Sequence, residues 1–235
     1  MSVAVVAGVG PGLGSSLARA FAAQGYAVAL VSRNASSGEP AAREITAAGG
    51  RALVVPADVT RPEEVSAAVA RIRADLGIPA ALAYNAGGYA RGPFLELDPA
   101  AFRRAFAVGV MGAVYLGQAL IPDMLRAGAG FISVTGATAA LRGRAGFAPF
   151  AIAKSSLRML AQSWAREFHP KGVHVVHIVV DGQIDTPKLR ERDPAPSAGS
   201  LIEPEAIAAA VIHALKQPRS AWSHEIDIRP SVEPF

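Results

Sequence analysis

Short runs rich in valine, isoleucine and leucine alternate with longer, alanine-rich stretches along the whole chain, and no other feature restricts the fold as strongly. The run at 3–7 is continuously apolar, as a parallel strand covered on both faces should be. Strands that alternate with helices are joined by right-handed crossovers, which build a parallel sheet with helices on both faces. The predicted strands are 3–7, 26–31, 51–56, 79–84, 130–135, 173–180 and 224–228. The sequence therefore predicts an α/β fold with a doubly wound, parallel, seven-stranded sheet.

Between these strands, apolar residues recur at helical spacing. The predicted helices are 13–24, 39–48, 62–76, 99–126, 149–168 and 203–216. Asp98 before Pro99 is a typical cap followed by a first-turn proline. The proline-rich, polar stretch 181–200 has no periodicity, so we expect a loop on the substrate side at about 181–202. Neither a repeat nor a linker divides the chain, and residues 1–235 are predicted to form a single domain.

The composition excludes several classes of protein. The chain has 235 residues and no cysteine, which excludes a disulfide scaffold, a cysteine nucleophile and a thiolate metal site. Its 23 basic and 19 acidic residues leave a formal net charge of +4, and the arginines are scattered. We therefore expect no nucleic acid as partner. His174 and His177 would point to opposite faces of one strand, and we expect no metal site there.

No segment is predicted to direct the chain to a membrane. The apolar N-terminal residues lack a preceding basic stretch, so they are interpreted as a strand and not as a signal peptide. The uncharged segment 105–122 contains three glycines and ends at Pro122, which favours a buried helix over a membrane span. We expect a cytoplasmic protein with no membrane partner.

A glycine-rich turn, GVGPGLG, follows the first predicted strand and precedes the first predicted helix. Its spacing is GxxxGxG, and the three glycines of this pattern are Gly8, Gly12 and Gly14. Glycines permit the tight turn and let the backbone approach a pyrophosphate, whose oxygens accept from the N–H groups at the helix start. The turn therefore predicts a dinucleotide site at the carboxyl ends of the strands of a Rossmann-type fold.

At this point the chain resembles the short-chain dehydrogenase/reductase family over nearly its whole length. The family's motifs occur in order: the glycine turn, Asp58-Val59, Asn85-Ala86-Gly87 and Lys154; Ala7 replaces the usual threonine before the first glycine. The resemblance implies that Asp58 binds the adenine amine, although a helix-capping role for Asp58 is the alternative. The implied cofactor-binding residues are Gly8, Gly12, Leu13, Gly14, Asp58, Val59, Asn85, Ala86, Gly87, Lys154 and Thr186.

The residues after the second strand bear on the choice of cofactor. An acidic residue there would bind a ribose 2′-hydroxyl and repel a 2′-phosphate, but the chain has Ser32-Arg33-Asn34. Arg33 offers a planar pair of donors to a phosphate, and Ser32 and Asn34 can hydrogen-bond beside it. We therefore expect NADP(H) in preference to NAD(H), with a solvated loop arginine as the alternative interpretation of Arg33.

The resemblance ends at the catalytic positions. The family's tyrosine lies four residues before the lysine, and this position is Phe150, which has no proton to give. The family's serine falls on Ala137 and its asparagine on Gly109. Loss of a general acid lowers the rate by about 10²–10⁴-fold, so ordinary carbonyl reduction by these positions should be severely weakened.

Other polar residues could replace the missing groups. Thr135 and Thr138 flank Ala137, and Thr138 is the better candidate donor. Asp181 stands after the sixth strand, where the family has proline, and could act as acid or base; the alternative is a loop residue bonded to local backbone N–H groups. By resemblance, Thr186 would contact the cofactor carboxamide. Tyr89 could reach the site or only pack.

Arg142 and Arg144 follow the fifth predicted strand and could bind an anionic substrate, or could simply be solvated. The helix around Phe106 is more apolar than one core face requires, and by resemblance it and the Lys154 helix imply a dimer or tetramer. Two functions remain open. The first is an NADP(H)-dependent oxidoreductase with an altered active site, acting on a small carbonyl or alcohol. The second is a non-catalytic NADP(H)-binding pseudoenzyme that serves as a sensor or subunit partner.

Overall fold

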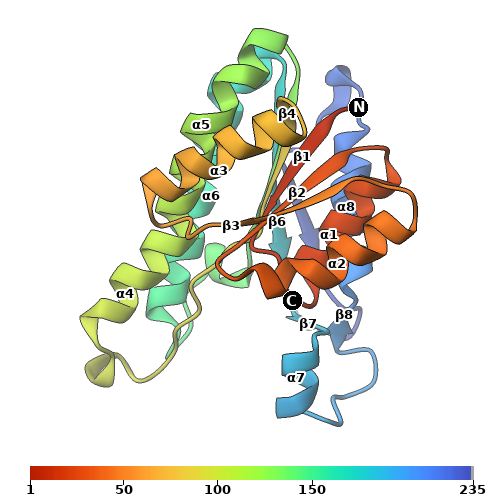
Figure 1. Ribbon diagram of the computed structural model, residues 1–235. Helices are drawn as coiled ribbons and strands as arrows, with labels where there is room; N and C mark the ends of the chain where they lie inside the picture. Colours follow the sequence, from red (N-terminus) through yellow and green to blue (C-terminus); the bar gives the residue numbers. More distant parts are fainter. Residues whose placement is uncertain (234–235) are drawn as a thin grey trace.

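The computed structural model describes residues 1–233 and contains a large parallel sheet (Figure 1). The strands of this sheet are β1 (Val3–Ala7), β2 (Ala27–Ser32), β3 (Ala52–Pro56), β4 (Pro79–Tyr84), β5 (Gly130–Thr135), β6 (Val173–Val180) and β9 (Glu225–Ile228). They lie in the order β3-β2-β1-β4-β5-β6-β9, and every neighbouring pair is parallel. The predicted doubly wound, seven-stranded sheet is confirmed. Its order reverses between β1 and β4, which creates a ligand-binding switch point at the carboxyl ends of the strands.

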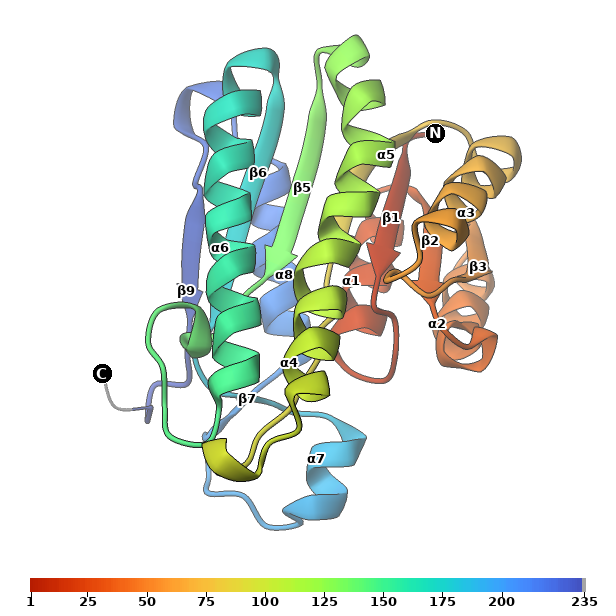
Figure 2. The same ribbon diagram turned by 90° about the vertical axis from the view of Figure 1, so that its left-hand side faces the viewer.

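Helices cover both faces of the sheet (Figure 2). One face carries α1 (Leu13–Ala23), α2 (Ala35–Ala47) and α8 (Pro204–Leu215). The other carries α3 (Pro62–Asp75), α5 (Gly112–Ala127) and α6 (Ala148–Phe168). Successive strand residues enter opposite cores, so Val5 belongs to the cluster on the α3 side and Val6 to the cluster on the α1 side. Burial on both sides is the reason that β1 is apolar at every position.

The predicted helix at 99–126 is interrupted. It consists of α4 (Pro99–Phe106), a π-helical turn η2 (Ala107–Met111) and α5. The Tyr84 hydroxyl donates to the Val108 carbonyl inside this turn, and a side-chain group inserted into the helical ladder widens it. A Cβ on Gly112 would lie 2.4 Å from the Tyr84 hydroxyl oxygen, so the close approach requires glycine. Burial raises the pKa of Tyr84, which keeps this hydroxyl a donor.

Within residues 1–233, the helix Pro99–Ala127 is the one that is long and apolar enough to cross a membrane by length and composition. Half of its apolar window is buried inside the protein, where α5 packs against the sheet. The helix is thus a layer of the fold.

The loop expected at about 181–202 contains short regular elements, so that expectation is wrong in part. Two short parallel strands, β7 (Gln183–Ile184) and β8 (Leu201–Ile202), pair with each other, and α7 (Pro187–Arg192) lies between them. The Thr186 hydroxyl caps α7 by accepting from the Leu189 N–H at 3.2 Å, and Pro187 occupies the first turn. The helix α2 begins at Ala35 and not at 39. Asn34 is its N-cap residue, and Pro40 lies inside the helix.

Candidate cofactor site and active site

The glycine turn between β1 and α1 has a backbone that other residues could not adopt. Gly8 has φ +89° and Gly12 has φ +106°. A Cβ on Gly8 would lie 2.4 Å from the Ala86 nitrogen, and one on Gly14 would lie 2.4 Å from the Gly8 oxygen. The three glycines therefore let the turn pack against the end of β4 and let α1 pack against the turn.

The start of α1 offers free donors. Gly12 stands at the N-cap without a side-chain cap, and the first hydrogen-bonded amides of the helix are those of Ser15 and Ser16. Among the described residues, the N–H groups of Leu13 and Gly14 have no acceptor, as is usual in a first helical turn. Such N–H groups, at the positive end of the helix dipole, suit a phosphate.

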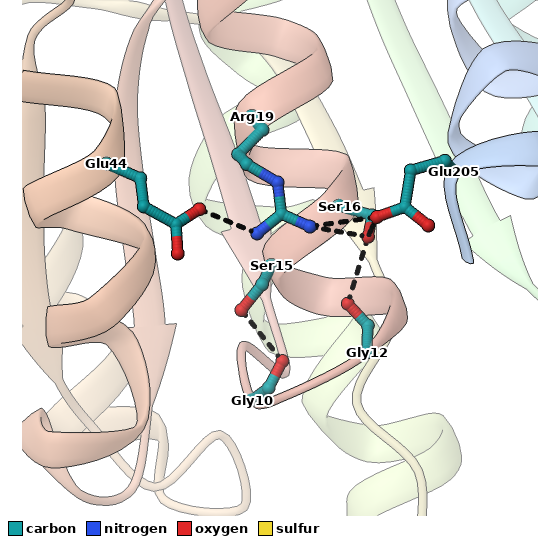
Figure 3. Close-up of polar contacts among 7 residues, drawn as sticks. All are labelled: Gly10, Gly12, Ser15, Ser16, Arg19, Glu44 and Glu205. Carbon is teal, nitrogen blue, oxygen red and sulfur yellow. Dashed lines mark hydrogen bonds and ion pairs between the residues drawn. The ribbon is translucent and has the colours of Figure 1, made fainter. Parts of the chain in front are cut away.

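A polar network fixes this helix end in place (Figure 3). The Ser16 hydroxyl donates to Glu205 of α8 at 2.7 Å. The Arg19 guanidinium forms ion pairs with two carboxylates. It lies 2.9 Å from Glu205 and 3.0 Å from Glu44 of α2. The hydrogen bond from Ser16 is the largest cause of the lowered pKa of the exposed Glu205. Sequence reasoning missed this network, since Glu44 and Glu205 lie 25 or more residues from Ser16 and Arg19.

The residues predicted to contact the adenosine end follow β2 and β3. Ser32 is buried and donates to the Asn34 carbonyl at 2.8 Å, so its hydroxyl shapes the turn. Arg33 is exposed, and its guanidinium makes no hydrogen bond or ion pair with residues 1–233. The pKa of Asp58 is lowered, chiefly by a hydrogen bond from the Thr60 backbone. The positive charge of Arg33 lies close enough to contribute to this lowering.

Asp58 serves a local turn and does not cap α3, whose N-cap residue is Arg61 and has no side-chain cap. Its Oδ1 accepts from the Thr60 N–H at 2.9 Å and from the Thr60 hydroxyl at 2.8 Å. Residues 1–233 leave Oδ2 without a donor, so the carboxylate retains acceptor capacity. The neighbouring Val59 is buried against Gly112 of α5.

The segment after β4 connects the two halves of the site. The Asn85 side chain donates to the Gly8 carbonyl at 3.0 Å and holds the glycine turn. A Cβ on Gly87 would lie 3.6 Å from Nζ of Lys154. Residues 85–87 thus extend from the glycine turn to the lysine, in the order that the motifs predicted.

Lys154 is buried in α6 without a carboxylate partner. Its Nζ donates to the Thr135 carbonyl at 2.5 Å and lies 5.7 Å from the centre of the Phe150 ring. Burial lowers its pKa to about 8. An ammonium group has three donors, and this one is bonded to a single protein acceptor, so two remain for a bound ligand.

The three positions that correspond to the family's tyrosine, serine and asparagine are Phe150, Ala137 and Gly109, and none of them carries a polar side chain. The Phe150 ring packs edge-on against Tyr89, with centroids 5.2 Å apart, so Tyr89 lies beside the position of the family's tyrosine. Ala137 is extended at the end of β5. Gly109 lies in the π-helical turn, where a Cβ would lie 3.0 Å from that of Ala153, so α6 crosses closely there.

A hydroxyl and a carboxyl group meet at the carboxyl ends of β5 and β6. Thr138 donates to Oδ1 of Asp181, which is only 3% exposed. Oδ2 of Asp181 lies 3.3 Å from the Arg229 guanidinium, which also pairs with Asp227. Side chains hold this carboxylate, in place of the local backbone groups considered above, and no sequence pattern indicated Arg229.

Thr186 lies against the glycine turn, since a Cβ on Gly12 would meet its Cγ2 at 2.6 Å. The segment that contains α7 therefore reaches the cofactor-facing side of α1. Among the described residues, no group of three or more histidine, aspartate or glutamate side chains is arranged to hold a metal ion.

Together these features fit a nicotinamide dinucleotide. The glycine turn packs so closely that a Cβ on Gly8, Gly12 or Gly14 would clash with the protein. The Leu13 and Gly14 N–H groups at the start of α1 have no acceptor among the described residues, and a buried lysine with spare donors lies beyond residues 85–87. A parallel sheet with such a turn at its switch point defines the Rossmann-type nucleotide-binding fold.

Comparison with known proteins identifies the family. Residues 2–196 match the model of the family described as short chain dehydrogenase. A cis-4-hydroxycyclohexanecarboxylate dehydrogenase from Sinomonas cyclohexanicum is 32% identical over 221 residues, which cover 89% of this chain and 87% of the relative. The chain therefore belongs to the short-chain dehydrogenase family and is an oxidoreductase of that type.

Solved structures agree. An alcohol dehydrogenase from Thermococcus sibiricus, complexed with 5-hydroxy-NADP, superposes with a TM-score of 0.90 at 26% identity, covering 100% of this chain and 98% of its own. A metagenomic short-chain oxidoreductase in complex with NADP gives a TM-score of 0.84 at 28% identity, covering 98% of each chain.

Proposed function

We propose that this protein is an NADP(H)-dependent oxidoreductase that interconverts an alcohol and a carbonyl compound on a small substrate. The observation that carries the proposal is the placement of Lys154: a buried ammonium group with unused donors, next to residues 85–87 and the glycine turn. Such a group can hold ribose hydroxyls. When bound, the cofactor accepts or delivers the hydride.

NADP(H) is the proposed cofactor because of Arg33. Its guanidinium is exposed, has no partner in residues 1–233 and lies within electrostatic range of Asp58, on the adenosine side of the glycine turn. A guanidinium binds a phosphate through two parallel hydrogen bonds. The two structural neighbours described above bind NADP or a modified NADP, which supports the same choice.

We assign the proton transfer to Thr138 and Asp181, because Phe150 and Ala137 have no exchangeable proton. In the direction of alcohol oxidation, the substrate hydroxyl gives its proton to Oγ1 of Thr138 as the threonine proton passes to Asp181. A bound cofactor would take up the hydride from the same carbinol carbon, which balances the loss of the proton. Arg229 compensates the negative charge of Asp181 before the transfer. Reduction follows the same path backwards.

The test compares Asp181→Asn and Thr138→Val with Asp227→Asn, a control that removes the other carboxylate partner of Arg229. Single-turnover oxidation of NADPH with a panel of ketones should slow by about 10²-fold or more in the first two variants. NADPH should still raise their melting temperatures, and the control should stay near wild type. Unchanged turnover in Asp181→Asn contradicts the assignment.

The second candidate is a non-catalytic NADP(H)-binding protein, a sensor or subunit partner. It is favoured by the apolar residues at positions 109, 137 and 150. If this candidate is correct, wild type binds NADPH without turnover, and Phe150→Tyr combined with Ala137→Ser generates activity on the ketone panel. Turnover by wild type that depends on Asp181 rejects it.

We also propose self-association as a dimer or tetramer. Phe106 of α4 and Ile152 and Met159 of α6 are apolar side chains that are 38%, 49% and 50% exposed. A charge placed among them, as in Met159→Glu, should lower the mass measured by light scattering. An unchanged mass contradicts this surface.

A further inference from the structure

Three arginines lie in the segments that follow β4 and β5. Arg91 follows β4 by several residues, and Arg142 and Arg144 follow β5. Their loops are joined, because the Gly92 N–H donates to the Gly146 carbonyl at 2.9 Å. Figure 2 shows the segments after β4 and β5 at the same end of the molecule, beside the first turns of α6.

Like Arg33, Arg103 and Arg104, these guanidinium groups have no carboxylate partner among residues 1–233, whereas several other arginines of the chain do. Arg61, Arg158 and Arg190 each pair with an acidic side chain. Arg91, Arg142 and Arg144 are exposed and make no side-chain hydrogen bond or ion pair with residues 1–233. The segments 85–95 and 136–150 contain no aspartate or glutamate at all. Glu96 and Asp98 come next along the chain and form no ion pair with them.

An apolar floor lies between the two loops. Tyr89 packs against Phe147 with centroids 6.3 Å apart and against Phe150 at 5.2 Å, and more than half of Tyr89 is exposed. The Lys154 ammonium lies 5.7 Å from the centre of the Phe150 ring. A surface of aromatic ring edges and faces favours contact with another ring or a short hydrocarbon skeleton.

We infer that the substrate is a hydroxy or oxo acid with an apolar, ring-sized skeleton. Its skeleton packs on the floor formed by Tyr89, Phe147 and Phe150, and its carboxylate binds Arg142 and Arg144, with Arg91 adding positive charge. Arginine suits this role because its fork of donors matches a carboxylate. The inference rests on the proposed function, since it names the substrate class of the same site.

The test is isothermal titration of NADP-loaded protein with 3- and 4-oxocyclohexanecarboxylate and with their methyl esters. The ester keeps the ring and the ketone and removes the charge. We expect one of the acids to bind about tenfold tighter than its ester, in line with charge-assisted hydrogen bonds at a partly exposed site. Raising the salt concentration should shrink this difference.

The variant Arg142→Gln/Arg144→Gln should bind the acid about as weakly as the ester and leave ester binding unchanged. Arg166→Gln, an exposed arginine near the other end of α6, should retain the wild-type preference. Equal binding of acids and esters, no binding of any of them, or an unchanged preference in the double variant overturns the inference. If NADPH does not raise the melting temperature, the proposed function fails, and the inference fails with it. If NADPH raises the melting temperature but the acids bind no tighter than the esters, only the inference fails.

Discussion

Replacement of Lys154 by methionine should make the protein more stable while removing a group that the proposed cofactor needs. The lysine side chain is almost completely buried, has no carboxylate partner, and donates to a single described acceptor, the Thr135 carbonyl. Methionine has a similar length and no charge, so it can fill the same space.

The magnitude follows from the pKa of Lys154, which burial lowers from 10.5 to about 8. This lowering corresponds to about 3 kcal/mol of lost stability when the lysine is charged. Loss of the hydrogen bond to Thr135 costs about 1 kcal/mol. The Met variant should therefore gain about 2 kcal/mol in the free energy of unfolding at pH 7, or about 4–8 °C in melting temperature for a chain of this length.

The pH dependence distinguishes this cause from simple repacking. Between pH 8 and 10.5 the unfolded wild-type chain holds more protons at this lysine than the folded chain does, so wild-type stability rises with pH. The advantage of Lys154→Met is thus complete below pH 8, declines across this window and is lost above it.

The assay is urea unfolding of both proteins at pH values below, within and above the window. Lys171→Met, which replaces an exposed lysine paired with Glu167 at 3.8 Å, is the control and should change stability little at any pH. A Met variant that is less stable at pH 7, or a stability difference that stays constant with pH, would refute the reasoning.

Three further predictions concern other parts of the molecule. NADPH should raise the wild-type melting temperature more than NADH does, and Arg33→Gln should abolish the difference; equal shifts in wild type contradict the 2′-phosphate role. Tyr84→Phe leaves the Val108 carbonyl without its donor and should lower the free energy of unfolding by about 1–3 kcal/mol in urea titrations, whereas no loss means that this bond is not needed. The hydrogen bond from Arg158 is the largest cause that lowers the pKa of Glu225 from 4.5 to about 2. The contribution of this carboxylate to the free energy of unfolding is therefore lost as the pH falls from 4.5 towards 2. Glu225→Gln should flatten acid unfolding over that range, and an unchanged acid profile contradicts the role of the pair.

Much of the fold could be predicted because its signals are local. A strand covered on both faces is apolar at each position, as in β1, and the seven predicted strands match the observed ones to within about two residues. The glycine turn is equally local, since the positive φ angles of Gly8 and Gly12 admit no other residue easily. The contact of residues 85–87 with both the turn and Lys154 agrees with the order of the motifs.

Other features depend on partners that are distant in the sequence. The break between α4 and α5 arises because Tyr84 donates to Val108, and the apolar pattern of 99–126 contains no sign of it. The helix α7 was missed although Thr186 and Pro187 are a capping signal, because six residues are too few to show a helical period.

The sequence alone determined the layered α/β architecture, the glycine turn and the identity of the residues at the strand ends, because backbone conformation and burial leave periodic traces in neighbouring positions. Only the tertiary structure decided which polar groups meet there: Thr138 with Asp181, 43 residues apart, and Asp181 with Arg229. Such pairings depend on strand order and on the packing of loops beyond the strand ends. A hydrogen bond between distant side chains requires only that two groups come within reach, and this leaves no periodic pattern in the chain.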